Sequence, residues 1–346
     1  MCKKISRKES EDFKKDVLGL YIKGFTPLSI ANALREKYNI TNKENGRAFV
    51  NFRARIRNCI SRYKNKPVDV ELHWNSDYIK IADIESKKRV SIRNVEPTTY
   101  KRVWDGTTEI KIAIVSDTHF GSKYTQFTHL NNFYDICQEE GVKDVYHVGD
   151  ITEGIKMRPG HEYDLYVIST DDMIDDVVAK YPRREGIITH FITGNHDASI
   201  YKHVGYDIGK TIASRRDDMK YLGRDCAVIN LTNKCTLELR HPWDGMAYAL
   251  SYKPQKMIDA MESDSKPNIL AIGHYHKAEY LFYRNVHTIQ AGCFQGQTPF
   301  TRGKGISVHL GGWIITIKVT EDGTIKSIAP QFIPCYKSIA DDYKNR

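Results

Sequence analysis

The chain of 346 residues is long enough for about two domains, and with 40% apolar residues it can form a substantial core. No apolar stretch reaches the roughly 18 residues of a membrane-spanning helix, and the first residues are charged rather than apolar, so we expect a soluble, cytoplasmic protein. The seven cysteines form no CxxC pair, which argues against a disulfide framework.

The positive charge is concentrated at the N-terminus. Residues 1–66 contain 17 Lys or Arg against 6 Asp or Glu, a net charge of +11, whereas the whole chain carries +9. The remainder therefore carries −2. A basic segment attached to a nearly neutral body is typical of a protein with a polyanionic partner, most often nucleic acid. We expect nucleic acid, and DNA first of all, as the partner.

The basic segment predicts a small all-α domain. Apolar residues recur at helical spacing over residues 10–23, and a glycine follows. Thr26 and Pro27 are an N-cap and a proline at the first helical position, so they predict the start of a second short helix. A third helix is expected over residues 43–64, with an apolar stripe along one side.

The third helix carries most of the arginines, which lie largely off its apolar stripe. Two short helices joined by a glycine turn and followed by an arginine-rich helix resemble a helix-turn-helix DNA-binding domain. The residues expected to contact nucleic acid are Arg47, Arg53, Arg55, Arg57, Arg62 and Lys64. Two alternatives remain open: a solvated helical bundle that the arginines keep soluble, and a module that docks another protein.

The rest of the chain predicts a β-rich linker and a larger mixed domain. Residues 67–108 contain strand-like alternation, which suggests a hairpin or meander that can also contribute to a sheet edge. From residue 109 to residue 346, strands and helices alternate at first, and short strands dominate after residue 219. This pattern predicts an α/β or α+β domain.

Most of the polar motifs in this domain follow apolar, strand-like runs. The motifs are Asp117-Thr118-His119, Gly149-Asp150, Gly194-Asn195-His196-Asp197, His241 and Gly273-His274-Tyr275-His276. Asp, Asn and His bind divalent metals through oxygen or imidazole nitrogen. Ligands at strand ends on one edge of a sheet can converge on one point, so the pattern predicts a metal site.

The same motifs, in the same order, resemble the calcineurin-like metallophosphoesterase superfamily, whose pattern is DxH, GD, GNH(D/E), a lone His and GHxH. The resemblance covers roughly residues 110–320. It implies a four-layer αββα sandwich with two packed mixed sheets, here preceded by the small helical domain.

The resemblance also implies a binuclear metal centre bridged by Asp150. The implied ligands of the first metal are Asp117, His119, Asp150 and His276. The implied ligands of the second metal are Asp150, Asn195, His241 and His274. Such a donor set accepts Mn, Fe, Zn or Co; we expect two divalent ions, with manganese as the first candidate.

Two further residues have implied catalytic roles. His196 would face the leaving group as a general acid or stabilise the phosphoryl charge, because an imidazole near its intrinsic pKa of about 6.5 suits both tasks. Asp197 would orient His196 from behind. His161 and His203 are candidates for contacts with substrate. The amide-rich residues 290–299 either contact a base or sugar or are turn chemistry.

These features predict a metal-dependent phosphodiesterase, in particular a nuclease that acts on DNA. Residues 116–121 resemble the start of the double-strand-break-repair nuclease branch, although residues 150–153 depart from its usual sequence and no coiled-coil segment is evident. Two alternatives use the same chain differently. One is a phosphomonoesterase on nucleotides or phosphoproteins, and the other is a nucleic-acid-binding regulator with a scaffold hydrolase domain.

Overall fold

The computed structural model describes residues 7–22, 27–35, 37–38, 40, 47–65, 98–262 and 264–345. The chain divides into two compact units, Met1–Val95 and Glu96–Arg346. The strands expected between residues 67 and 97 lie outside the described residues. Among the described helices, none combines the length and apolarity that crossing a bilayer requires.

The first unit contains three helices, α1 (Arg7–Ile22), α2 (Pro27–Leu34) and α3 (Arg47–Asn65). They pack around buried apolar side chains, among them Phe13, Phe49 and Phe52. Helix α2 begins at Pro27, as the sequence predicts. The turn before it, residues 23–26, lies outside the described residues. The helical content of this segment therefore agrees with the sequence, and its helix-turn-helix character stays a prediction.

The arginines of α3 differ in exposure. Arg55 and Arg57 are exposed, and Arg53 is half-buried. The guanidinium of Arg55 lies 4.7 Å from the centre of the Phe13 ring. The side chains of Arg47, Arg62 and Lys64 lie outside the described part of the chain.

The second unit contains two six-stranded sheets. The first sheet has the order β12-β11-β2-β3-β4-β5 and the second has the order β1-β6-β7-β8-β10-β9. The strands of the first are β2 (Glu109–Val115), β3 (Asp144–Val148), β4 (Ile188–Thr193), β5 (Met219–Arg224), β11 (Gly311–Val319) and β12 (Ile325–Pro334). The strands of the second are β1 (Thr98–Lys101), β6 (Cys226–Asn230), β7 (Thr236–Arg240), β8 (Ile269–Ile272), β9 (Ala278–Tyr283) and β10 (Val286–Ala291).

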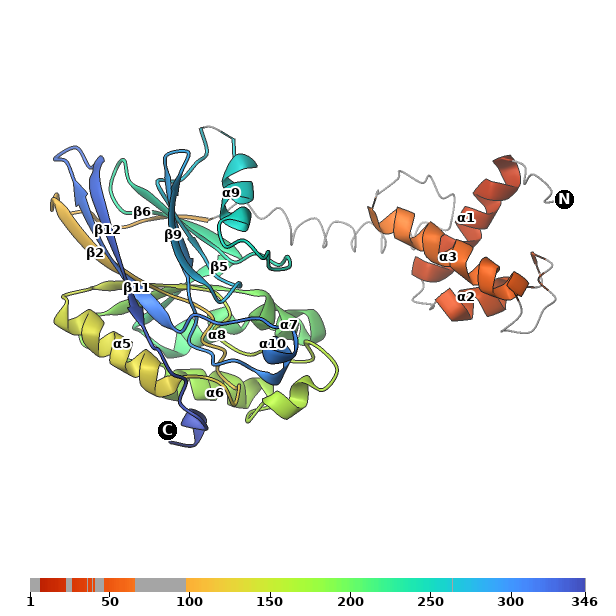
Figure 1. Cartoon of the computed structure of the whole chain (residues 1–346), viewed down its shortest axis with the longest axis horizontal. Helices are drawn as coiled ribbons and strands as arrows, with labels where there is room; N and C mark the ends of the chain where they lie inside the picture. Colours follow the sequence, from red (N-terminus) through yellow and green to blue (C-terminus); the bar gives the residue numbers. More distant parts are fainter. Residues whose placement is uncertain are drawn as a thin grey trace. The chain divides into compact units, whose positions relative to one another are not determined.

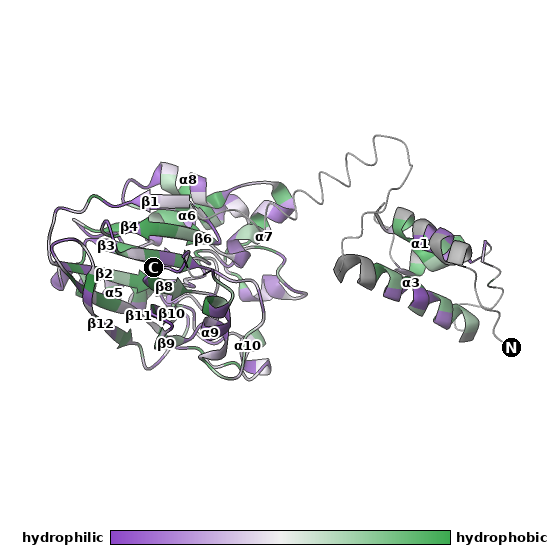
Figure 2. Cartoon of the chain, turned by 90° about the horizontal axis from the view of Figure 1, so that it is seen from above, coloured by the Kyte–Doolittle hydropathy of each residue, from purple (hydrophilic) through white to green (hydrophobic). Residues whose placement is uncertain are grey.

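Both faces of the central strands are buried, which explains their nearly continuous apolar sequences. In β2, Ile112 and Ile114 pack in the core between the two sheets, whereas Ala113 and Val115 pack against helices. Figure 2 shows β3 and β4 as mostly hydrophobic, while the helices on the surface carry hydrophilic residues as well. β2, β3, β4 and β5 are parallel to one another, so their carboxyl ends meet at one edge.

Helices cover the outer face of each sheet. The helices α5 (Phe127–Glu139), α6 (Thr170–Lys180) and α8 (Ile208–Arg215) pack on the first sheet, and α9 (Tyr252–Asp259) packs on the second. Figure 1 shows α5 and α6 on one side of the body and α9 on the opposite side. The remaining helical segments are α7 (Asn195–Val204), α10 (Pro299–Gly303), η1 (His161–Asp164) and η2 (Asp342–Asn345). This is the predicted four-layer αββα sandwich.

The strand β1 lies within residues 67–108, the stretch that was expected to be a linker. It pairs in parallel with β6, with Thr98 opposite Ala227 and Lys101 opposite Asn230. It is therefore an edge strand of the second sheet and part of the body. Its four residues are too few for a distinctive alternation, so only the pairing reveals the role.

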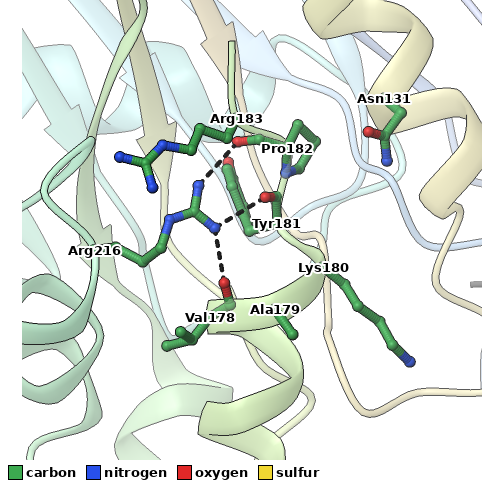
Figure 3. Close-up of a pocket in the computed structure, with 8 residues that line it drawn as sticks. All are labelled: Asn131, Val178, Ala179, Lys180, Tyr181, Pro182, Arg183 and Arg216. Atoms are coloured by element: carbon green, nitrogen blue, oxygen red, sulfur yellow. Dashed lines mark hydrogen bonds between the residues drawn. The ribbon is translucent and has the colours of Figure 1, made fainter. Parts of the chain in front are cut away.

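The carboxyl end of α6 is held by one buried arginine. Arg216, 5% exposed, donates to the carbonyl oxygens of Val178, Tyr181 and Pro182 (Figure 3) and forms an ion pair with Asp218. These carbonyls have no partner within the helix, and the guanidinium satisfies them. The contact fixes the turn that leads into β4.

Candidate metal centre

Every predicted metal ligand lies just beyond the carboxyl end of a strand. Asp117 and His119 follow β2, Asp150 follows β3, and Asn195 follows β4 as the first residue of α7. His241 follows β7, and His274 and His276 follow β8. The two sheets therefore contribute ligands from one end, as the parallel pairings β2-β3-β4 and β7-β8 require.

The first cluster comprises Asp117, His119 and His276. The Nε2 atoms of His119 and His276 lie 3.1 Å apart. Oδ1 of Asp117 lies 3.3 Å from Nε2 of His276 and 3.8 Å from Nε2 of His119. Oδ2 of Asp150 lies 3.9 Å from Nε2 of His119. Ligand atoms of Asp117, His119 and His276 thus lie within 4.8 Å of one another, and Asp150 approaches this group at His119.

The second cluster comprises Asp150, Asn195, His241 and His274. Nε2 of His241 lies 3.2 Å from Oδ2 of Asp150 and 3.1 Å from Oδ1 of Asn195. Ligand atoms of Asp150, His241 and His274 all lie within 4.8 Å of one another. Oδ2 of Asp150, which lies 3.2 Å from Nε2 of His241, is also 3.9 Å from Nε2 of His119 in the first cluster. This is the position of the predicted bridge.

These donor atoms fit divalent cations. Ligands that bind one ion at about 2.0–2.2 Å lie roughly 3–3.5 Å apart, and the closest contacts above have this spacing. The two Nε2 atoms of His119 and His276 lie close together, so they cannot both carry a hydrogen in that space, whereas a bound cation would accept both lone pairs. The set of imidazole, carboxylate and amide donors is chemically suited to Mn, Fe, Zn or Co.

Backbone acceptors orient two of the imidazole rings. Nδ1 of His241 donates to the carbonyl oxygen of Val148 at 2.7 Å, which directs Nε2 toward Asp150. Nε2 of His274 donates to the carbonyl oxygen of Asp244 at 2.8 Å, which leaves Nδ1 for the cluster. Contacts of this kind fix the tautomer and the direction of a ligating histidine.

Five of the predicted ligands have left-handed backbone conformations. The φ angles are 52° at Asp117, 51° at His119, 54° at Asp150, 76° at His274 and 53° at His276. Side-chain-bearing residues seldom adopt this region, and such strain persists where the surrounding structure imposes it, often at functional sites. The sharp turns allow ligands that are close in sequence, such as Asp117 and His119, to direct their side chains toward the same cluster.

The glycines of the motifs are required by close packing at the centre. A Cβ atom on Gly194 would lie 2.3 Å from Oδ1 of Asp150 and 2.6 Å from Nε2 of His241. A Cβ atom on Gly273 would lie 2.4 Å from the carbonyl oxygen of Val148. Any side chain at these positions would displace ligands.

His196 lies beside the first cluster on the side that solvent reaches. Its ring centre is 4.6 Å from that of His119, and its side chain is 19% exposed, whereas His119 and Asp117 are buried. Its Nδ1 contacts the carbonyl oxygen of Glu153 at 2.7 Å, and its backbone N–H donates to Oδ1 of Asp150 at 2.8 Å. Burial lowers the pKa of His196 below its ordinary value.

Asp197 was expected to orient His196, but in the structure its carboxylate bonds to other groups. The Asp197 carboxylate accepts hydrogen bonds from the backbone N–H groups of Gly194, Ile151 and Thr152, at 2.8–3.1 Å, and from the Thr152 hydroxyl. Burial, together with the nearby Asp150, raises its pKa to about 6. Asp197 therefore fixes the loop after Asp150 to the start of α7 rather than holding the His196 ring.

Glu153 is a buried residue of the site that the motif pattern does not include. Its carboxylate lies 2.9 Å from Nδ1 of His119 and 2.9 Å from Nε2 of His161. Burial alone would lower the pKa of His119, but Glu153 and the neighbouring aspartates outweigh it and raise the pKa to about 10. Its position three residues after Asp150 and one before Gly154 was the available signal in the sequence.

Two of the suggested substrate contacts lie behind the centre instead. His161 is fully buried and bonded to Glu153, and Gln295 is 3% exposed and donates to Glu153 and to Ser122. Neither side chain is accessible to a substrate. His203, by contrast, is exposed on α7, outside the clusters.

A pocket of about 460 Å³ at the end of α6 does not coincide with this centre. Its lining includes Lys180, Arg183 and Arg216 but none of the predicted ligands (Figure 3). Each of these three cations is paired with an aspartate. The ligand clusters, not this pocket, are therefore the candidate functional site.

Comparison with known proteins yields a family match and a set of relatives. The model of the calcineurin-like phosphoesterase superfamily domain matches residues 110–309. The chain is similar to the DNA polymerase II small subunit of Methanocaldococcus jannaschii, with 27% identity over 253 residues, which cover 58% of this chain and 41% of the relative. For the DNA polymerase II small subunit of Methanothermobacter thermautotrophicus, the identity is 25% over 247 residues, covering 58% and 51%.

The chain spans about half the length of these curated relatives. Among solved structures, one described as a novel archaeal phosphodiesterase aligns with 65% of this chain and 100% of its own, at 13% identity and a TM-score of 0.38.

Proposed function

Because this chain belongs to the calcineurin-like phosphoesterase superfamily, we propose that it is a metal-dependent phosphodiesterase whose substrate is nucleic acid, with DNA as the first candidate. The observation that carries the proposal is the pair of ligand clusters, with Oδ2 of Asp150 lying 3.2 Å from His241 of the second and 3.9 Å from His119 of the first. No other described group combines so many buried donors from five strand ends.

The proposed assignment keeps Asp117, His119, Asp150 and His276 on the first ion and Asp150, Asn195, His241 and His274 on the second. Two divalent ions held in this way would make a water nucleophilic at neutral pH and neutralise charge on the phosphoryl oxygens. Because the donor set includes only two carboxylates, the loaded centre is strongly positive and attracts an anionic ester.

His196 is proposed to act on the leaving group. In hydrolysis the water oxygen bonds to phosphorus, the ester P–O bond breaks, and the departing oxygen needs a proton. His196 is the partly exposed imidazole beside the buried cluster, so it is placed to supply that proton. Its Nδ1 is held by the Glu153 carbonyl oxygen, which leaves Nε2 for the substrate side.

Two features support nucleic acid as the substrate. Residues 1–66 carry a net charge of +11, and a basic domain is the usual electrostatic signature of nucleic-acid binding. The curated relatives are named as subunits of a DNA polymerase. A diester backbone, rather than a free phosphate group, is the substrate that both features favour.

The first test compares hydrolysis of bis(p-nitrophenyl) phosphate with that of p-nitrophenyl phosphate, in the presence of Mn²⁺, for the wild type and for His196→Ala. We expect a preference for the diester and a fall in kcat of about 100-fold or more in the variant, the usual contribution of a general acid. His287→Ala is the matched control, because His287 lies on β10 opposite Ile269, at the end of β8 remote from the ligands.

A preference for the monoester would replace the nuclease proposal by a phosphatase. If the wild type bound Mn²⁺ and yet hydrolysed neither ester nor DNA, the relatives' names would favour a second candidate, a non-catalytic subunit that uses the body as a scaffold.

A further inference from the structure

An aromatic and cationic patch lies next to the second ligand cluster. We define this aromatic patch as Tyr201, Lys202, Arg224 and Trp243. Tyr201 and Lys202 belong to α7, the helix that begins with Asn195 and His196, and Trp243 comes two residues after His241. The patch is therefore continuous in sequence with three residues of the candidate centre.

Two cation–ring contacts organise the patch. Nζ of Lys202 lies 4.1 Å from the ring centre of Trp243, and the guanidinium of Arg224 lies 3.6 Å from the ring centre of Tyr201. Trp243 and Tyr201 remain 39% and 38% exposed. Aromatic rings with this exposure, grouped with cations, offer a ligand both a surface for stacking and positive charge.

The patch is fixed firmly to the centre. The indole Nε1 of Trp243 donates to Oδ1 of Asp225 at 2.8 Å, and the carbonyl oxygen of Asp225 accepts from the backbone N–H of His241 at 2.7 Å. The backbone N–H of Asp225 in turn donates to the carbonyl oxygen of Thr193, at the end of β4. A ligand that rests on Trp243 is thus held at a defined position relative to His241.

The chemistry of the patch fits a strand with unpaired bases. Ring faces of Trp and Tyr stack on bases of any sequence, and nearby Lys and Arg bind the phosphates that connect them. Arg224 is paired with Asp207 at 3.3 Å, whereas Lys202 has no ion pair among the described residues and lies over the Trp243 ring. Lys202 is therefore the cation that the patch offers to a phosphate. In a fully paired duplex the bases stack on each other and offer no face to Trp243.

We propose that the aromatic patch binds the single-stranded part of a nucleic-acid substrate and leads it to the metal centre, so that unpaired strands are the preferred substrate. The preference for unpaired strands as substrates rests on the proposed phosphodiesterase function. The binding of a single strand to the aromatic patch does not depend on that function. The competing occupant, a partner protein, becomes an outcome of the experiment.

The binding test uses the full chain in EDTA and an oligothymidylate of about 20 nucleotides, with a hairpin duplex of equal length as the comparison. Stacking on Trp243 should quench tryptophan fluorescence with the oligothymidylate, and the quenching should be largely lost in Trp243→Phe. Equal quenching by the duplex, or quenching that is unchanged in Trp243→Phe, would overturn the proposal.

A second variant guards against loss of folding. Lys202→Gln should make the dependence of log K on log salt for oligothymidylate shallower by about 0.7, the value for one phosphate contact to a single strand. Lys210→Gln is the matched control, because Lys210 is an exposed lysine on the neighbouring helix α8. If Trp243→Phe and Lys202→Gln both behave like the wild type, the patch does not bind the strand. A partner protein is then the remaining candidate for its occupant.

Cleavage separates this inference from the proposed function. With Mn²⁺, Trp243→Ala should lower the ratio of oligothymidylate cleavage to bis(p-nitrophenyl) phosphate hydrolysis by about 10-fold, the typical effect of one stacking contact. If Trp243→Ala hydrolyses both substrates at an unchanged ratio, strand binding by the aromatic patch is overturned and the proposed phosphodiesterase function is retained. Trp243-dependent quenching in a protein that hydrolyses nothing would support the patch and overturn the phosphodiesterase.

Discussion

At the scale of single residues, the candidate centre depends on side chains that are absent as much as on those that are present. Gly194 and Gly273 leave room for Asp150, His241 and the Val148 carbonyl oxygen, where any Cβ atom would collide. A motif glycine next to a ligand is therefore part of the site, although it contacts no ion.

Substitution of Gly194 tests this crowding. In Gly194→Ala the new methyl group must displace Asp150 or His241, so we expect Mn²⁺ affinity to fall by about 10- to 100-fold, the range seen when groups that orient ligands are removed. Isothermal titration calorimetry measures the effect. Gly245→Ala is the control, because a Cβ atom there meets nothing within 4 Å. Equal affinities in the two variants would contradict the geometry of the centre.

At the scale of elements, the N-terminus of α5 is capped by a residue that is distant in sequence. The local N-cap residue, Gln126, makes no capping hydrogen bond with its side chain. Instead, the buried carboxylate of Asp342 accepts from the backbone N–H of Thr128 at 2.7 Å and from its hydroxyl at 2.6 Å. A carboxylate at this end also interacts favourably with the helix dipole. The contact attaches the C-terminal segment to the body.

Removal of this cap should destabilise the body. We expect Asp342→Ala to lower the free energy of unfolding by about 1–2 kcal/mol, the upper part of the range for loss of an N-cap. Urea denaturation followed by circular dichroism measures the difference. Asp341→Asn is the neighbouring control, since the Asp341 side chain is 60% exposed and pairs with exposed Lys344, and asparagine tolerates the left-handed φ of 54° at this position. If the two variants were equally stable, Asp342 would not act as a cap.

At the scale of the whole molecule, the charge is divided between two units with separate cores. The first unit has its own apolar core around Phe13 and Phe52, and its exposed arginines on α3 include Arg55 and Arg57. The second unit carries the ligand clusters. We propose that the first unit supplies most of the non-specific affinity for DNA and the second supplies the chemistry.

The salt dependence of DNA binding tests this division. If Arg55 and Arg57 each contact a phosphate, Arg55→Gln combined with Arg57→Gln should make the slope of log K against log salt shallower by about 1.8 for duplex DNA. Fluorescence anisotropy at several salt concentrations gives the slope. The control combines Lys318→Gln with Lys326→Gln, two exposed lysines of the second unit. An unchanged slope would favour a first unit that docks a protein.

The sequence alone was sufficient for the architecture and for the position of the centre. Continuous apolar runs identified the buried strands, because central strands are covered on both faces, and the polar residues just after them marked one sheet edge. The αββα sandwich follows from these runs and from the family pattern. These features are local in sequence, so periodicity and motif order reveal them.

Only the tertiary structure decided which groups the remaining side chains contact. Asp197 bonds to the loop after Asp150 rather than to His196, Glu153 lies against His119, and Asp342 caps a helix more than 200 residues away. Each contact joins segments that no local pattern connects. Their partners are set by how the sheets and helices pack, because most buried polar groups bond to a donor or acceptor among the residues that packing brings near.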